Sequence, residues 1–285
     1  MQHVGVIKEI WRYPVKGMAG ESLAQCDLGP EGLEGDRVWA LRDSARGEIQ
    51  SCKFRPELLQ CTAALRPSGA VDVVMPSGDV IASDDLHIHQ RLSELVGHPS
   101  TLESLKPLDK AGDNRHFYRR YKPNKHSWLD ELKDTFAREP GEPLPDFSQM
   151  PQQAQDFVTL PGTFFLVSPF HIITTASVRC LQKQLPAADW DVRRFRPNVV
   201  IETSDGAEGL LEQTWLGRQL LLAGLPIDCT AAAPRCGAVT RAQAGLGADK
   251  TMLRTIVRRA AQNLGIYGAL REAGTIRVGD PVALL

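Results

Sequence analysis

The stretch LLLAGLPI, residues 220–227, leads into AAAPRCGAVT, residues 231–240. The first stretch is apolar and contains Ala-Gly, which predicts a β-strand followed by a turn. The small residues of the second stretch bring Cys236 out beside Arg235. A thiol next to a fixed positive charge is favoured as a thiolate, which is both a nucleophile and a soft metal ligand. A single cysteine among small residues is also a common buried packing residue, so the rest of the chain must decide between these interpretations.

The first hundred residues predict mainly strands, because short runs rich in β-branched and aromatic residues alternate with turn signals. Strands are expected at residues 4–13, 22–28, 36–42, 71–75 and 79–81. Residues 43–47 and 76–78 predict hairpin loops. Residues 84–96 predict a short helix that ends at Gly97.

The pattern is interrupted from about residue 106 to 155, where charged residues, Pro and Gly dominate. We interpret this segment as a polar insert or lid, since a long stretch without periodicity is usually functional or mobile. Within it, residues 115–122 (RHFYRRYK) combine basic and aromatic residues as single-strand nucleic-acid platforms do. Nothing else in the chain extends a basic surface, so we prefer a solvated loop or a lid with anchoring aromatics.

Regular structure is expected again from residue 157. The chain predicts a strand and turn at 163–170, a helix at 177–185 capped by Thr174 or Thr175, a strand at 195–201, strands around a turn at 215–218, a helix at 249–264 and a hairpin-like closing strand at 274–284. Many short strands with few helices favour an α+β, mostly β, or β-barrel architecture over a doubly wound sheet.

The composition excludes several classes of function. A chain of 285 residues with a formal net charge of −1 has room for one large or two small domains and no bulk attraction to nucleic acid or anionic membranes. No signal peptide and no apolar run long enough to span a bilayer are found, so cytoplasm is the expected location. Motifs for nucleotide phosphates, an α/β-hydrolase serine and a paired-histidine zinc site are missing.

The six cysteines form no C-x-x-C pair, no histidine-paired zinc pattern and no group of four for an iron–sulfur cluster. Thiols are expected to stay reduced in the cytoplasm. We therefore interpret Cys26, Cys52, Cys61 and Cys180 as ordinary packing residues.

Five short fragments, separated along the chain, together resemble the pattern of one protein family. They are RYPVKG at 12–17, GDRVW at 35–39, FRPNV at 195–199, Arg235-Cys236, and GDPV at 279–282. In this order and spacing they resemble the MOSC superfamily, the domain shared with the C-terminal part of molybdenum cofactor sulfurases. Within it, the chain is most similar to the mitochondrial amidoxime reducing component and its bacterial counterparts.

The resemblance covers nearly the whole chain and implies three parts. Residues 1–105 would be an N-terminal β-rich MOSC-associated domain and residues 156–285 a MOSC β-barrel-like domain. The polar insert or lid at 106–155 has no clear counterpart motif. The implied cofactor is molybdenum cofactor, which offers a phosphate, a polar pterin and a dithiolene that holds the metal, with no role for pyridoxal phosphate.

The resemblance also implies roles for individual residues. Cys236 would be the metal ligand and the catalytic residue. The phosphate and pterin would be bound by Lys16, Gly17, Arg37, Arg196 and Asn198, with Ser168 and Arg235 beside them. Arg196 and Asn198 are two apart in the strand expected at 195–201, so their side chains would share a face. Pro197 would fix the backbone between them.

The implied activity is reduction of N-hydroxylated or N-oxide compounds. No flavin, nicotinamide or iron–sulfur motif is present, so electrons would come from a separate redox protein, such as a flavin reductase, a cytochrome b5-like protein or an iron–sulfur protein. One alternative is a carrier that holds the cofactor, or sulfur on Cys236, for another enzyme. A second is a cofactor-free interaction protein that kept the fold.

Three positions depart from the family pattern. Gly17 stands where a hydroxyl residue is common, and Pro234 stands where a serine often precedes the Arg-Cys pair. Residues 240–243 (TRAQ) keep the threonine of a Thr-x-Asp-Pro pattern and lose its Asp-Pro. Cofactor binding is therefore better supported by the sequence than the substrate class.

Overall fold

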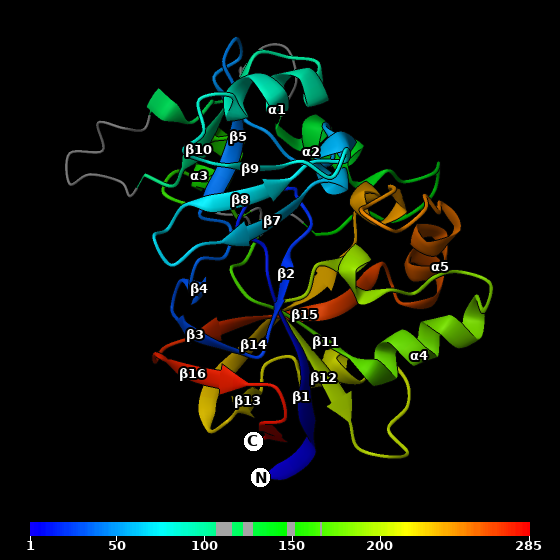
Figure 1. Cartoon of the computed structure of the whole chain (residues 1–285). Helices are drawn as coiled ribbons and strands as arrows, with labels where there is room; N and C mark the ends of the chain where they lie inside the picture. The colour runs from blue at the N-terminus through cyan, green and yellow to red at the C-terminus, as the bar shows by residue number, and fades with distance from the viewer. Residues whose placement is uncertain (107–115, 122–127, 147–151, 166) are drawn as a thin grey trace.

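The structure is a computed structural model that describes residues 1–106, 116–121, 128–146, 152–165 and 167–285. The described chain is mostly β, with short helices at its edges (Figure 1). Its largest unit is a closed barrel of seven strands, and three small sheets of three strands each make up most of the remaining β-structure. This confirms the predicted α+β, mostly β class.

Strands from both ends of the chain form the barrel. Their order around it is β12 (Val199–Thr203), β11 (His171–Thr174), β15 (Asn263–Leu270), β14 (Leu225–Pro234), β13 (Gln219–Leu222), β17 (Pro281–Leu284) and β1 (Gln2–Arg12). The ring closes because β1 also pairs with β12, with Ile7 opposite Ile201. Gln2 lies opposite Leu284, so the two termini meet at one end of the barrel (Figure 1).

Apolar residues of these strands and of the segments beside them fill the inside of the barrel. Ile10, Phe170, Trp215 and Ile266 are among its fully buried side chains. Each large apolar side chain removed from water contributes roughly 1.5–3 kcal/mol. Because β1 supplies part of this core, the barrel cannot form from the C-terminal half of the chain alone.

The small sheets lie mostly in the N-terminal part of the chain. The first sheet contains β10 (Ser100–Ser104), β5 (Trp39–Asp43) and β6 (Glu48–Ile49). The second contains β7 (Thr62–Leu65), β8 (Val71–Val74) and β9 (Val80–Ala82). The third contains β16 (Gly274–Arg277), β3 (Gln25–Gly29) and β4 (Gly32–Leu33). The short strand β2 (Glu21–Leu23) pairs with β1. The 3-10 helix η1 (Pro56–Gln60) and α1 (Ile88–Val96) pack with the first two sheets around a separate core that includes Leu41, Leu58 and Val73.

Several local predictions are confirmed. The first predicted helix is α1, and Gly97 ends it in the left-handed conformation that glycine favours, with φ 69°. The second is α4 (Thr175–Gln184), where the Thr174 side chain accepts a hydrogen bond from the Ser177 backbone N–H. Both hairpins are present, as β5–β6 and β8–β9.

Other local predictions are wrong. Residues 163–165 and 167–170 form no strand, and β11 begins only at His171. The strand expected at 195–201 starts at Val199, because Val192–Phe195 forms the 3-10 helix η3 and Arg196 ends it in a left-handed conformation with φ 56°.

The C-terminal elements also differ from expectation. The last helix, α5 (Thr251–Arg259), is shorter than expected. The closing segment is no hairpin, since β16 pairs with β3 and β17 pairs with β1 and β13. A further 3-10 helix, η4 (Leu211–Trp215), precedes β13.

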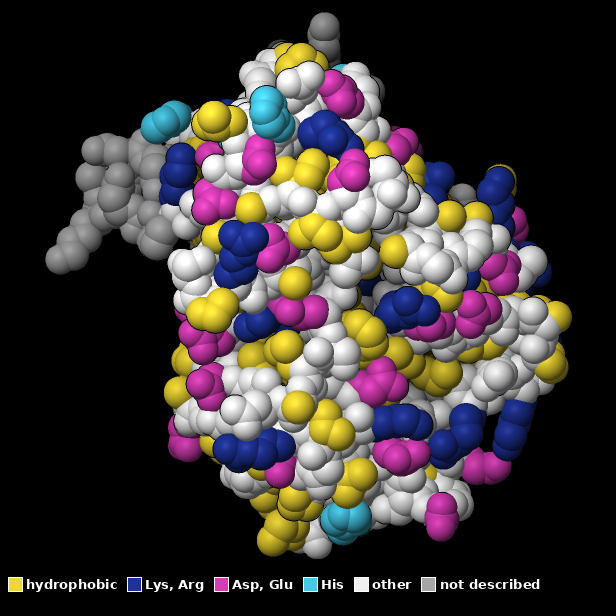
Figure 2. Space-filling view, in the orientation of Figure 1, with side chains coloured by type: hydrophobic (Ala, Val, Ile, Leu, Met, Phe, Trp, Pro, Cys, Tyr) yellow, Lys and Arg dark blue, Asp and Glu magenta, His cyan; other side chains and the backbone are white. Residues whose placement is uncertain are grey.

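The insert contributes α2 (Trp128–Phe136) and α3 (Gln152–Asp156). Phe117 and Tyr118 are buried, and Arg119 forms ion pairs with Glu48 at 2.8 Å and Glu131 at 3.2 Å. These contacts favour a lid with anchoring aromatics over a nucleic-acid platform, although residues 115 and 122 of that motif lie outside the described residues. On the face drawn in Figure 2, Lys and Arg are interspersed with Asp and Glu. No helix in the described segments has the length and apolar character to cross a membrane.

Candidate functional site

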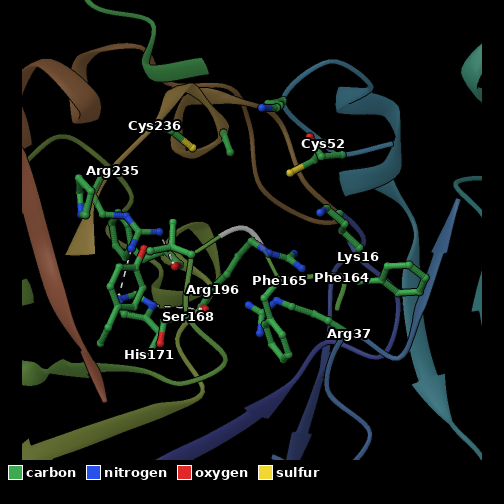
Figure 3. A pocket seen from close by; sticks show the side chains of 18 of the residues that line it. Lys16, Arg37, Cys52, Phe164, Phe165, Ser168, His171, Arg196, Arg235 and Cys236 are labelled. Carbon is green, nitrogen blue, oxygen red and sulfur yellow. Dashed lines mark hydrogen bonds between the residues drawn. The ribbon is translucent and has the colours of Figure 1, made fainter. Parts of the chain in front are cut away.

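A cavity lies where the barrel meets the N-terminal sheets (Figure 3). The centres of water-sized molecules can occupy about 170 Å³ inside it, and its mouth is open to solvent. Its lining residues come from loops, strands and helices of both parts of the chain. They include Lys16, Gly17, Arg37, Ser51, Cys52, Lys53, Phe136, Phe164, Phe165, Ser168, His171, Arg194, Arg196, Pro234, Arg235, Cys236 and Tyr267. Seven of the eight site residues predicted from the sequence are in this set.

Cys236 follows β14 and precedes the 3-10 helix η5 (Gly237–Thr240). Its side chain is partly buried and points into the cavity (Figure 3). A Cβ at Gly237 would lie 3.0 Å from the Cβ of Ala137, so the end of α2 packs directly against the cysteine loop. The insert therefore forms part of the wall around the thiol, and Phe136 lines the cavity there.

Arg235 is held beside a buried histidine. One of its terminal nitrogens donates to the Phe195 carbonyl at 2.7 Å, and the other lies 3.3 Å from His171 Nε2. Burial lowers the pKa of His171 well below its ordinary value, and the Arg235 charge adds to the shift. The ring is thus neutral and can accept the Arg235 hydrogen bond when its proton is on Nδ1. Arg235 Nε is buried without a partner among the described residues.

Asp36 organises the next pair of arginines. Its buried carboxylate accepts hydrogen bonds from the Tyr13 backbone N–H at 2.7 Å, from the Asn198 amide at 2.9 Å and from Arg37. The guanidinium carbons of Arg37 and Arg196 lie 5.0 and 4.2 Å from the centre of the Tyr13 ring. The two positive charges are therefore fixed close together at one side of the cavity.

Asn198 is not among the residues that line the cavity. It is buried, and besides its bond to Asp36 it accepts a hydrogen bond from the His171 backbone N–H at 3.1 Å. The prediction that Arg196 and Asn198 share one strand face is wrong, because Arg196 ends η3 and the strand begins at Val199. Asn198 positions Asp36 and His171, which in turn support the cavity residues.

Lys16, Gly17 and Ser168 line the cavity. Gly17 has a φ of 87°, and a Cβ there would lie 3.0 Å from the backbone nitrogen of Cys52. Both observations favour glycine over a residue with a side chain at this position. Lys16 is buried, and none of the described residues forms an ion pair with it.

Positive charge dominates the lining of the cavity. Its lining includes six cationic side chains and, among the described residues, no carboxylate. The cations are Lys16, Arg37, Lys53, Arg194, Arg196 and Arg235. Among the described residues, only Arg37 and Arg194 have a carboxylate within ion-pair distance. Burying this much unpaired positive charge is costly, and an anionic ligand would offset that cost.

Sequence reasoning missed part of the site. Ser51, Cys52 and Lys53 all line the cavity, although they match no motif. Cys52 was interpreted as a packing residue, whereas its side chain faces the cavity across from Cys236 (Figure 3). Burial raises the pKa of the Cys52 thiol. Cys26 and Cys61 are buried in the two cores, as predicted.

The comparisons with known proteins agree with this architecture. The model of the MOSC domain matches residues 160–283, and the model of the MOSC N-terminal beta barrel domain matches residues 4–107. The chain belongs to the MOSC family. The two matches leave out most of the insert, which is the part of this MOSC protein that packs against the cysteine loop.

Full-length relatives of this MOSC protein are distant. The mitochondrial amidoxime reducing component 2 of Bos taurus is 24% identical over 99% of this chain and 84% of its own length. The mitochondrial amidoxime-reducing component 1 of Homo sapiens is 24% identical over 100% of the chain and 84% of its own length. A molybdenum cofactor sulfurase of Pyricularia oryzae is 24% identical over 72% of the chain and 30% of its own length.

The buried Lys16 predicts a pH-dependent stability. Burial lowers its pKa to about 7, and the neighbouring Lys53 charge adds to the shift, whereas unfolding restores a pKa near 10.4. Below pH 7 the buried charged amine therefore lowers the free energy of unfolding of the cofactor-free protein by its full amount. This cost disappears as the pH rises toward 10. We expect Lys16→Met to unfold at higher urea than wild type at pH 6.

Urea titrations of both proteins, without cofactor, between pH 6 and 9 measure this difference. The advantage of Lys16→Met should shrink by up to about 1.4 kcal/mol for each pH unit above 7. Taking the difference cancels groups common to both chains. An advantage that stays constant over this range would show that Lys16 titrates normally in the folded protein.

Proposed function

We propose that this MOSC protein binds molybdenum cofactor in the cavity and reduces N-hydroxylated or N-oxide compounds with electrons from a separate redox protein. The observation that carries the proposal is the Cys236 thiol facing a cavity lined by six cations and by no described carboxylate. The amidoxime-reducing names of the full-length relatives support the same class of substrate.

The residues present fit the chemistry of the cofactor. A phosphate and a polar pterin need charge-assisted and neutral hydrogen-bond donors. Arg196 and Lys16 have no carboxylate partner among the described residues, and Ser51 Oγ and Arg235 Nε are buried there without hydrogen bonds. A ligand with several acceptors would satisfy these groups, each of which otherwise carries a cost of about 1–3 kcal/mol.

Each residue then has a role. Cys236 would hold the metal through its sulfur, a soft ligand suited to a metal already bound by sulfur. Lys16, Arg37 and Arg196 would bind the phosphate and pterin, with the Gly17 N–H, Ser168 and Arg235 as further donors. Asp36 and His171 would fix the directions of Arg37 and Arg235 through the hydrogen bonds described above.

When bound, the cofactor supplies a metal that changes oxidation state by two electrons and can accept an oxygen atom. Removal of a hydroxyl oxygen as water also consumes two electrons and two protons from outside the substrate. The sequence contains no motif for a flavin, nicotinamide or iron–sulfur cluster, so the electrons are assigned to a separate donor. The partly buried cavity would limit the access of water to the reacting atoms.

Turnover tests this proposal most simply. Protein made in a host that synthesises molybdenum cofactor should contain close to one molybdenum per chain. It should convert an aromatic amidoxime to the amidine with a chemical electron donor under anaerobic conditions. Molybdenum without turnover of any amidoxime, hydroxamate or N-oxide would instead indicate a carrier, and protein without molybdenum would contradict both functions.

A further inference from the structure

Lys53 is a cavity cation to which none of the roles above gives a function. Resting on the proposed function, we propose that Lys53 recognises the substrate and that the preferred N-hydroxylated substrates carry a second, anionic group such as a carboxylate. The anion would pair with the Lys53 ammonium while the N–O group faces the metal that Cys236 would hold. Lys53 is thus a specificity-determining residue, and the insert is the element that places it.

The insert fixes the position of Lys53 relative to Cys236. Lys53 Nζ donates a hydrogen bond of 2.9 Å to Thr135 Oγ1 in α2. The Thr135 carbonyl oxygen lies 3.5 Å from the point where a Cβ of Gly237 would stand, directly after the cysteine. One residue of the insert therefore touches both the ammonium and the cysteine loop, which places the charge beside the reacting end of the cavity.

The ammonium is available for a ligand. None of the described residues forms an ion pair with Lys53, and Thr135 is the one described side chain that accepts a hydrogen bond from it. Its nitrogen also lies 4.7 Å from the centre of the Phe54 ring, which stabilises the charge without neutralising it. An ammonium has three donors, so donors remain for a carboxylate that enters the cavity.

The other cations are arranged for a different partner. Arg37 and Arg196 stack on Tyr13, and Arg235 is bound to His171. These groups come from the N-terminal loops and the barrel, whereas Lys53 is held by the insert. The arginines are therefore placed to bind the cofactor. Phe136 lines the same cavity as Lys53 and offers an apolar surface for the substrate body.

Further contacts fasten the insert to the residue before Cys236 and to the helix α5. Arg138 donates to the Arg235 carbonyl at 3.1 Å and to the Gln262 side chain at 3.0 Å. Arg258 of α5 lies 3.3 Å from Glu139, and Arg254 pairs with Glu142. These contacts hold α2 in place, and α2 holds Lys53 through Thr135. A residue that selects substrates needs such a fixed position.

Binding of inert product analogues to the cofactor-loaded protein tests the proposal without turnover. Calorimetry should compare 4-carboxybenzamide with benzamide, which differ by one carboxylate. Wild type should bind the carboxylated amide more tightly, and Lys53→Gln should reduce that preference roughly tenfold or more, the loss expected for a hydrogen bond between charged groups. Lys53→Arg should restore most of it.

Lys133→Gln is the matched control, because it removes an exposed lysine charge from α2, the helix whose Thr135 holds Lys53. It should leave the preference unchanged. Molybdenum content, measured for every variant, reports on the proposed function separately from the ratio of dissociation constants. Equal binding of both amides by wild type, an unchanged preference in Lys53→Gln, or loss of molybdenum from that variant would each overturn the assignment of Lys53 to the substrate.

Discussion

Replacing Cys236 by serine is expected to lower kcat/KM for an amidoxime at least about 100-fold, more than the loss of a residue that only supports a metal ligand. The hydroxyl of serine is a harder and far less acidic ligand than a thiol, so it cannot take over the bond to a metal bound by sulfur. The change is nearly isosteric in a partly buried loop, and the fold should remain.

Cys180→Ser is the control for this variant. Cys180 is also partly buried, but it lies in α4 and is not among the residues that line the cavity. Steady-state kinetics of the three proteins, normalised to molybdenum content, separate loss of the metal from loss of its reactivity. If Cys236→Ser kept more than half of the wild-type activity, the thiol would not be a ligand that the reaction needs.

Replacing Asp36 by alanine is expected to destabilise the fold by about 3–5 kcal/mol, the cost of leaving a buried charge without its partner. Asp36 is 3% exposed, and its carboxylate accepts hydrogen bonds from Arg37, the Tyr13 backbone and Asn198. Its removal leaves an arginine, an amide and a backbone N–H unsatisfied at the junction of barrel and N-terminal sheets. Urea unfolding measures the loss.

Glu202→Ala provides the comparison, because Glu202 of β12 pairs with Lys8 of β1 at the surface, with both side chains more than 40% exposed. This loss should stay below about 1 kcal/mol. Asp36→Asn, which keeps acceptor oxygen for Tyr13, should be less destabilising than Asp36→Ala. Similar small effects for Asp36→Ala and Glu202→Ala would show that the buried network adds no stability.

Local patterns were enough to predict much of the fold. Gly97 at a helix end and the Pro-Ser-Gly turn at 76–78 are signals that act over a few residues, and the structure has both features. Such signals could not predict closure of the barrel, because β1 pairs with β12 almost 200 residues away in the sequence. The prediction of a hairpin in the closing segment is wrong for the same reason, since its strands pair with distant partners.

The site also contains residues that sequence motifs predict and residues whose position depends on distant contacts. Lys16, Arg37, Arg196 and Cys236 were found because separated motifs resemble one family, and the fold brings them to one cavity. Asn198 lies behind the cavity because the chain turns at Arg196, a conformation that the sequence around Pro197 does not specify. Lys53 belongs to no motif, since its position depends on Thr135 in an insert that the family models leave unmatched.

The central claim is that Cys236 binds molybdenum in this cavity, and X-ray absorption at the molybdenum edge tests it most directly. The cofactor dithiolene contributes two sulfurs, and Cys236 would add one more. Wild type should therefore show one more sulfur neighbour around molybdenum than Cys236→Ser. The variant should contain the same number of molybdenum atoms per chain as wild type, or fewer. The same number of sulfur neighbours in both proteins, or wild-type protein that contains no molybdenum, would contradict the account.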